Sequence, residues 1–303
     1  MKNFMLKIYS TVFSFFYSLN GILPTWIPIK LQYWISTGVW IDFDNPIGYA
    51  QKIQWIKAFY RNPLYIKCSD KYTVREYVEK KGFGHLLPDL LGVYDAPSQI
   101  DFSKLPDSFV LKISTGSGSN FFISSKENID VDNIISCLEK NMMAKQRTSS
   151  GETHYLYSKR KIICEKYLSQ EDYLPADYKF YCCDGKVLAI NYGPQRPVNN
   201  NCKMYIVDMQ LNDISAEKTL DGIEFVAPVH FDDMIYAAKE LSKGFPFVRV
   251  DFYETESGFY FSELTFTPSG GTNKYLSKEA DLWLGEQIEL PTDYYSRIGK
   301  WVY

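Results

Sequence analysis

The chain has 303 residues, 46% hydrophobic and 23% charged, a composition typical of a folded globular protein rather than a disordered one. Its formal net charge of -3 gives no electrostatic reason to expect nucleic acid as a partner. The six cysteines are scattered without a CxxC pair and only three histidines occur, which argues against both a zinc site and a disulfide framework. These counts favour reduced thiols in a cytoplasmic protein.

The N-terminal segment contains an uncharged, aromatic-rich stretch over residues 8–29. It is long enough to span a bilayer, but we expect Asn20-Gly21, Pro24 and Pro28 to break any helix there. Two interpretations stay open. Residues 4–29 contact a membrane interface, at the inner face of the membrane, or they form a helix that packs on the protein's own core or on a partner.

The first half of the chain predicts helices and then a hairpin. Apolar residues recur with helical spacing over 45–60, and Ser69-Asp70 can cap a second helix over 71–81. The strand-like runs SFVLKIS and FFISS flank the glycine- and serine-rich run at 115–120, which indicates a hairpin with a glycine-rich loop. A third helix is expected over 129–143.

The second half predicts antiparallel hairpins. Asp184-Gly185 is a strong two-residue turn signal, and a helix is expected over 231–243. Residues 190–230 give no convincing assignment. The pattern predicts an α+β fold rather than a regular βαβ repeat, with strands at 161–168, 177–185, 186–193, 247–255 and 258–266.

A first group of candidate functional residues combines Lys112 with the run Thr115-Gly116-Ser117-Gly118-Ser119-Asn120. A lysine on the strand before a glycine-rich hairpin can place its ammonium beside a phosphate, and glycines let backbone amides approach the phosphate oxygens. The run matches neither a Walker A motif nor a Rossmann fingerprint. A flexible hairpin with a surface lysine is the alternative interpretation.

A second group consists of Arg249 and Asp251 on one expected strand, with Glu263 and Thr265 on the next. Strand alternation places the members of each pair on one face of their strand. If the two faces coincide, two carboxylates converge with an arginine, and Mg²⁺ would suit such a group. An exposed ladder of charges or an Arg–Asp salt bridge is the alternative.

Three further signals lie between these groups. The apolar strand ending in Glu165-Lys166-Tyr167-Leu168 can line an adenine slot, although an ordinary strand end would look the same. Asp177 and Lys179 share a face of the next strand, toward the same cleft or toward water. Arg196 could contact an anionic substrate.

Together these stretches resemble the teichuronopeptide-biosynthesis (TupA-like) branch of the ATP-grasp superfamily. The resemblance covers about residues 45–275 and implies an α+β fold with a nucleotide cleft between two antiparallel-sheet subdomains. It is carried by SDKYTVREYV, LPDSFVLKISTGSGSN, ICEKYL, DYKFYCCDGKV and VRVDFYETESGFYFSELTFTPSGG. The implied organisation is an N-terminal segment, a substrate-side domain, a small ATP-grasp subdomain and a large one, at 1–44, 45–104, 105–168 and 169–303.

The resemblance also implies roles for individual residues, with ATP and Mg²⁺ as cofactors. Nucleotide contacts fall to Lys71, Lys112, Thr115, Gly116, Ser117, Gly118, Ser119, Glu165, Lys166, Tyr167, Leu168, Asp177 and Lys179. Catalytic roles fall to Lys112, Lys179 and Arg249, metal ligation to Asp251, Glu263 and Thr265, and substrate binding to Arg196, Ser269 and Gly270. Thr265 stands where many ATP-grasp enzymes have asparagine, and a hydroxyl is the weaker ligand.

The expected reaction joins a carboxylate and an amine through an acyl phosphate. The resemblance suggests polysaccharide biosynthesis, with a uronic-acid carboxylate of a capsule or O-antigen sugar as acceptor and an amino acid or other amine as donor. Alternatives are a kinase-like phosphotransferase on the same fold, a glycosyltransferase and a non-catalytic binding module.

Overall fold

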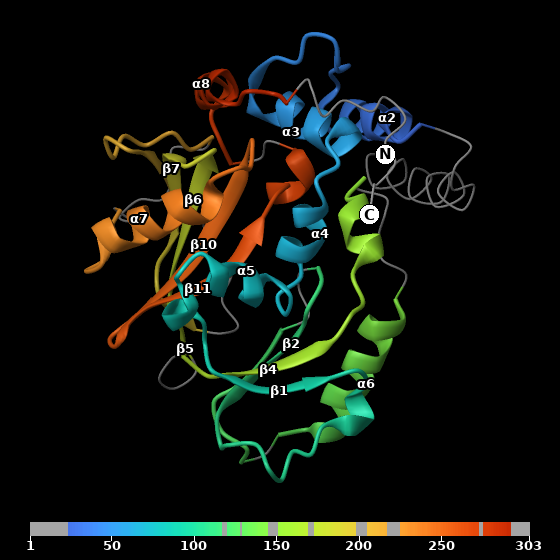
Figure 1. The fold of residues 1–303 in the computed structure, drawn as a ribbon, viewed down its shortest axis with the longest axis vertical. Coiled ribbons are helices and arrows are strands. Elements are labelled where there is room, and N and C mark those ends of the chain that lie inside the picture. Colours follow the sequence, from blue (N-terminus) through green and yellow to red (C-terminus); the bar gives the residue numbers. More distant parts are fainter. Residues whose placement is uncertain are drawn as a thin grey trace.

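The structure is a computed structural model that describes residues 24–116, 120–127, 129–144, 151–168, 173–197, 205–216, 225–272 and 275–291. Over these residues the chain forms a four-stranded and a five-stranded antiparallel sheet with helices around them (Figure 1). No helix within the described ranges is long and apolar enough to cross a membrane. Most of the segment predicted to contact a membrane, residues 4–23, lies outside the described residues.

The first helices are α2 (Trp26–Thr37), α3 (Gly48–Phe59), α4 (Pro63–Ser69) and α5 (Val74–Lys80). The predicted break at Pro28 is wrong, because this proline lies in the first turn of α2, where its missing N–H needs no helical partner. The helix predicted over 71–81 begins three residues late. Asp70 Oδ1 accepts hydrogen bonds from the amides of Tyr72 and Thr73, so the chain makes a turn before α5.

The four-stranded sheet has the order β1 (Leu90–Tyr94), β4 (Ile162–Lys166), β2 (Phe109–Ile113) and β3 (Asn120–Ile123). Helix α6 (Val131–Met143) covers one face of it (Figure 1). Phe109 and Leu111 of β2 form a core with Ile134 and Leu138 of α6, and all four are buried. The opposite face of this sheet is left to face the rest of the molecule.

The five-stranded sheet has the order β11 (Gly258–Thr265), β10 (Val248–Thr255), β6 (Ala176–Cys183), β7 (Lys186–Gly193) and β9 (Tyr205–Asp208). Asp184 and Gly185 form the predicted turn between β6 and β7, both with positive φ, of 41° and 81°. Helix α7 (Phe231–Ser242) buries Met234, Ala237 and Leu241 in a hydrophobic core that also contains residues of this sheet. The other face of the sheet therefore remains for the helices α3 to α5 and for a site.

Short elements complete the fold. β5 (Tyr173–Leu174) pairs with β8 (Arg196–Pro197), and the 3₁₀ turns are at Gly84–Leu86, Pro97–Gln99, Thr153–Tyr157 and Pro268–Gly271. Helix α8 (Lys278–Gln287) lies on α3, and a Cβ on Gly285 would stand 2.4 Å from Gly48 Cα, so the contact requires glycine. The strands β8 and β9 are too short to leave a periodic signal, which explains why residues 190–230 had no assignment.

Candidate active site

A row of polar side chains crosses the five-stranded sheet. Asp251 pairs with Glu263 on β11 and with Lys179 on β6, and Lys179 pairs in turn with Asn191 on β7. Residues directly opposite each other in antiparallel strands project to the same face. All four side chains therefore lie on one face of the sheet.

A β-bulge brings the two acidic residues of this row together. Near the β10–β11 turn Phe252 pairs with Phe261, and a regular register would then place Asp251 opposite Ser262. The register shifts between Asp251 and Phe252, so that Asp251 pairs with Glu263 and Ser262 is the extra residue of the bulge. Without this shift the carboxylate of Glu263 would project to the opposite face of the sheet.

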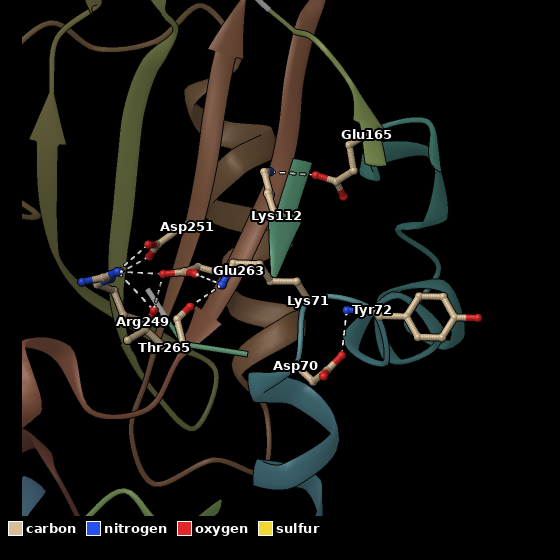
Figure 2. A network of polar contacts seen from close by, with 10 residues as sticks. Asp70, Lys71, Tyr72, Lys112, Glu165, Arg249, Asp251, Glu263 and Thr265 are labelled. Atoms are coloured by element: carbon tan, nitrogen blue, oxygen red, sulfur yellow. Dashed lines mark hydrogen bonds and ion pairs between the residues drawn. The ribbon is translucent and has the colours of Figure 1, made fainter. Parts of the chain in front are cut away.

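Arg249 connects the acidic residues at the centre of the site (Figure 2). Its Nε donates to Asp251 Oδ1 at 2.7 Å and its Nη2 to Asp251 Oδ2 at 2.6 Å. Nη2 also lies 3.4 Å from Glu263 Oε1 and 3.1 Å from Thr265 Oγ1, which itself donates to Glu263 Oε1 at 2.9 Å. The group predicted from strand alternation is thus one connected cluster.

The two carboxylates of this cluster differ in their pKa values. Burial raises the pKa of Asp251 to about 7, although Arg249 and Lys179 lower it in part. Burial also disfavours ionisation of Glu263, but Lys71 and Arg249 outweigh it and lower the pKa of that carboxyl to about 2. Glu263 is therefore the carboxylate that stays charged over the whole neutral range.

Lys71 reaches this cluster from the loop between α4 and α5. Its backbone amide donates to Ser114 O at the end of β2, and Ser114 Oγ donates to Asp70 Oδ2, both at 2.7 Å. Lys71 Nζ donates to Gly116 O at 2.8 Å. The same atom lies 3.4 Å from Glu263 Oε2 (Figure 2). One lysine therefore connects the start of the glycine-rich loop with a carboxylate of the other sheet.

The four-stranded sheet contributes a second buried charge cluster. Lys112 Nζ donates to Glu165 Oε2 at 2.7 Å (Figure 2), and Arg75 Nη1 donates to Glu165 Oε1 at 3.1 Å. Lys112 Nζ also stands 5.9 Å from the centre of the Tyr253 ring, which belongs to β10 of the larger sheet. Burial would lower the pKa of Lys112, but Glu165 and Tyr253 more than offset it and raise that pKa.

A cavity of about 230 Å³ opens between the two sheets. It is lined by Lys112, by the run Glu165-Lys166-Tyr167-Leu168, and by Asp177 and Arg196. All four residues predicted to hold adenine therefore face one cavity, beside the lysine predicted to contact phosphate. Asp177 forms a buried ion pair with Lys179, two residues along β6.

The remaining predicted residues lie in different places. Thr115 is buried and Gly116 has a φ of 84°, whereas Ser117, Gly118 and Ser119 lie outside the described residues. The turn at Ser269-Gly270 contacts α3: Gly270 O accepts hydrogen bonds from Lys57 and Gln54, at 2.7 and 3.1 Å. This turn is not part of the cavity lining, whereas Arg196 is. The residues predicted to bind substrate are thus divided between two places.

The sequence reasoning missed three residues of the site. Arg75 has its partner Glu165 at a distance of 90 residues along the chain, and no local pattern signals such a pair. Tyr253 was counted only as part of a strand. Asn191 is 3% exposed on β7, and a polar residue inside the apolar run KVLAINYG was a signal that alternation could have used.

The donor set suits a magnesium ion. Asp251 and Glu263, with the hydroxyl of Thr265, supply oxygen ligands of the kind that Mg²⁺ prefers, usually with phosphate oxygens completing the shell. Within the described ranges no group of three or more His, Cys, Asp or Glu side chains gathers as metal ligands. A site of two carboxylates shared with a nucleotide is compatible with that finding. Metal ligation by these residues stays a prediction.

Comparison with known proteins gives a family and a set of similar folds. The family model described as TupA-like ATPgrasp matches residues 51–289, most of the chain. This match confirms the family, the fold and the ATP-grasp class of enzyme predicted from the sequence. The predicted domain boundaries and the roles of individual site residues stay predictions. No curated protein matches the chain.

Several solved structures are similar at low identity. An L-amino acid ligase from Bacillus licheniformis is 13% identical with a TM-score of 0.43, over 68% of this chain and 44% of the ligase. A D-alanine–D-alanine ligase from Bacillus anthracis complexed with ATP is 18% identical with a TM-score of 0.42, over 80% of this chain and 68% of that one. The corresponding ligase from Helicobacter pylori is 14% identical with a TM-score of 0.44, over 81% and 62%. This chain thus spans less than half of the first of these ligases.

Proposed function

The chain belongs to the TupA-like ATP-grasp family, and on this premise we propose that it is an ATP-dependent carboxylate–amine ligase. The observation that best supports the proposal is the approach of Lys71 Nζ to Glu263 Oε2, at 3.4 Å. A residue proposed to contact phosphate and a residue proposed to bind metal thereby meet between the sheets. A nucleotide in the cavity beside Lys112 would have its phosphates directed toward this meeting point.

The proposed binding mode uses each wall of the cleft differently. The adenine would lie against Glu165, Lys166, Tyr167 and Leu168, and Lys71 and Lys112 would neutralise the phosphates. Mg²⁺ would be held by Asp251 and Glu263, with Thr265 beside them, and would supply positive charge at the phosphate oxygens. Asp177 and Lys179 lie between the cavity and the acidic cluster on the same face of the sheet.

The first chemical step is attack of a substrate carboxylate oxygen on the γ-phosphorus of ATP. The bond from the γ-phosphorus to the bridging oxygen breaks, ADP leaves with that oxygen, and an acyl phosphate forms. Negative charge spreads over the transferring oxygens, and the guanidinium of Arg249 and the ammonium of Lys112 are the cations of this chain proposed to stabilise it. Arg249 is already held by two hydrogen bonds to Asp251, so little reorganisation is needed.

The second step is attack of an amine on the carbonyl carbon of the acyl phosphate. The amide bond forms, phosphate leaves, and the nitrogen releases a proton to solvent or to the departing phosphate. Water would compete with the amine for the acyl phosphate, and closure of the loop after Thr115 is the proposed means of excluding it. Ser269 and Gly270 stay the proposed contacts for the substrate on the side of the cluster away from the cavity.

The identity of the two substrates is proposed from the family alone. We propose that the carboxylate belongs to a uronic acid of a capsule or O-antigen polysaccharide and that the amine is an amino acid or a related donor. A cytoplasmic enzyme would meet such a sugar at the inner face of the membrane, and residues 4–29 are the segment proposed to contact lipid there.

The test is product analysis by mass spectrometry after incubation with ATP, Mg²⁺, uronic-acid sugars and amino acids. We expect a mass that corresponds to an amide, with ADP and phosphate in equal amounts. Glu263→Gln is expected to lower ADP formation by at least about 100-fold, because it removes a charged ligand while it preserves shape. Glu256→Gln, in the exposed turn of the same hairpin, is the matched control and should keep its activity.

The same assay separates the alternatives. ADP formation that needs no amine, with a stable phosphorylated sugar as the product, would favour a phosphotransferase over a ligase. Full turnover by the Glu263→Gln variant would remove this residue from the metal site and would contradict the proposed mechanism.

A further inference from the structure

Arg196 lines the proposed nucleotide cavity, away from Ser269 and Gly270, the residues with which it was predicted to bind substrate. It lies on β8, whose pairing with β5 places it opposite Leu174. Tyr167 Oη donates to Tyr173 O at 3.1 Å, so this small two-stranded sheet is fastened to the segment that follows β4. Tyr173, Leu174 and Arg196 all line the cavity together with Tyr167. The side chain of Arg196 therefore belongs to a constructed wall of the cavity.

The guanidinium of Arg196 has an unmet hydrogen-bonding requirement. Within the part of the chain that the structure describes, its Nη1 is buried and has no hydrogen-bond partner. A buried donor on a charged group is costly unless an acceptor meets it. Because native proteins rarely leave such a donor unsatisfied, a ligand of the cavity is a natural source of the acceptor.

The acidic residues of the cavity do not supply that acceptor. Glu165 already accepts hydrogen bonds from Lys112 and Arg75, and Asp177 is paired with Lys179. These two are the only carboxylates in the lining formed by described residues. Because the described part of the chain offers Arg196 Nη1 no acceptor, a ligand in the cavity is the source that we consider for it.

The register of the five-stranded sheet indicates which end of a bound nucleotide would supply that atom. Asp251 and Glu263 lie in the row that contains Lys179 and Asn191, whereas Asp177 pairs with Gly193, the last residue of β7. Arg196 comes three residues beyond Gly193, so it can lie up to about 16 Å along the chain from Asn191. In the proposed binding mode the phosphates are directed toward Asp251 and Glu263, so Arg196 would lie toward the nucleoside end of the nucleotide.

We propose that Arg196 binds the nucleoside part of the nucleotide, by donating a hydrogen bond to an acceptor atom of the base or of the ribose. This inference rests on the proposed nucleotide site, and it moves Arg196 from the acceptor substrate to ATP. Arginine suits this role because its charge is permanent and its donors are fixed in one plane, so that they orient a planar ligand.

The test is direct binding measured by calorimetry, with ADP, adenosine and pyrophosphate as separate ligands in the presence of Mg²⁺. Arg196→Ala is expected to weaken ADP and adenosine binding by at least about 10-fold and to leave pyrophosphate binding unchanged. Arg196→Lys keeps the charge and should show an intermediate loss, which also guards against a simple failure to fold. Gln195→Ala, the exposed neighbour on the same segment, is the control that should bind like the unaltered protein.

Steady-state kinetics supply a second readout. The alanine variant should show a raised KM for ATP with an unchanged KM for the carboxylate acceptor. With 2′-deoxyadenosine, disappearance of the difference between the variant and the unaltered protein assigns the 2′-hydroxyl, and persistence assigns the base or another oxygen of the ribose. Unchanged adenosine affinity in the alanine variant, or a loss confined to pyrophosphate, would overturn the proposal.

Failure of this inference is distinguishable from failure of the proposed function. If the unaltered protein binds ADP, and Arg196→Ala weakens ADP and adenosine binding but not pyrophosphate binding, the inference stands even when no ligase product forms. If the unaltered protein binds no adenine nucleotide, both the nucleotide site and the role of Arg196 are overturned. Raised KM for the acceptor alone would return Arg196 to the acceptor substrate.

Discussion

The two sheets build their buried charge clusters in different ways. In the four-stranded sheet, β2 and β4 pair in a regular register, and Lys112 meets Glu165 as a diagonal neighbour on one face. In the five-stranded sheet, Asp251 and Glu263 face each other only because of a bulge. On the side of the four-stranded sheet, Lys112 and Arg75 of α5 surround the carboxylate of Glu165. On the five-stranded sheet, two carboxylates, Asp251 and Glu263, surround Arg249.

This difference gives the cleft two chemically distinct walls. A wall with excess positive charge suits the nucleotide, and a wall with excess negative charge suits a divalent cation. Lys71 lies where the walls meet, in contact with the glycine-rich loop and with Glu263. Each of the tests that follow disturbs one wall or the segment that connects them.

The largest expected effect follows from removing the second carboxylate of the acidic cluster. Asp251→Asn keeps the shape of the side chain opposite Glu263 and removes its charge, and with it a proposed ligand of Mg²⁺. We expect ADP formation to fall by at least about 100-fold, as in Glu263→Gln, because a charged ligand is lost. The measurement is ADP release with Mg²⁺, accompanied by circular dichroism to establish that the sheet persists.

Ser262→Ala is the control for this substitution, because it lies beside Glu263 on β11 and leaves both carboxylates in place. It should retain activity within about 3-fold. Full activity in Asp251→Asn would show that Asp251 does not act as a metal ligand.

The bulge also marks the limit of what the sequence could predict. Alternation correctly put Arg249 with Asp251, and Glu263 with Thr265, because period two holds within each strand. Whether the two faces coincide depends on the register between the strands. Counted from the turn, a regular register would have separated them, and nothing in GFYFSELTF announces the extra residue.

Other limits have the same origin in long-range contacts. The hairpin turn at Asp184-Gly185 was predictable because its residues act locally through positive φ. Arg75 and Tyr253 were not, because each meets its partner only after distant elements come together. Arg196 was recognised as a candidate, but only the structure places it in the wall of the cavity, on a strand that pairs with β5.

A smaller effect, on stability, is expected where the turn before β4 packs against the core of the five-stranded sheet. His154 lies in the turn before β4, against the rings of Tyr65 and Phe266 in the core of the large sheet. Burial lowers its pKa to about 4, although Glu152 partly opposes this shift. As the pH falls below about 6.5 the unfolded chain takes up a proton before the folded chain does, so stability is lost toward pH 4.

We expect this linkage to account for about 2 kcal/mol of the free energy of unfolding lost between pH 8 and pH 5. His154→Phe keeps an aromatic ring in the core and removes the titration, so its stability should fall less over that range. Urea unfolding of both proteins at the two pH values measures the difference. Equal losses in the two proteins would show that His154 is not responsible for acid sensitivity.

The smallest expected effect tests the cationic wall. Arg75 does not line the cavity, but it donates to Glu165 at 3.1 Å and to Pro88 O at 2.7 Å, and so orients the carboxylate that Lys112 contacts. Arg75→Gln should raise the KM for ATP about 10-fold and leave kcat nearly unchanged, because the residue positions a binding group rather than a reacting one. Arg75→Lys should recover part of the loss, since it returns the charge without the second donor.

Changes in the two charge clusters should affect different kinetic parameters. If the four-stranded sheet acts mainly in holding the nucleotide, the whole effect of Arg75→Gln lies in KM, whereas loss of the Asp251 carboxylate on the five-stranded sheet acts on kcat. Raised KM follows from a Glu165 carboxylate that is free to turn and a Lys112 ammonium that is no longer fixed beside the cavity. A fall confined to kcat would mean that the small sheet also orients the phosphates for transfer, and the separation of the two walls into binding and chemistry would be wrong.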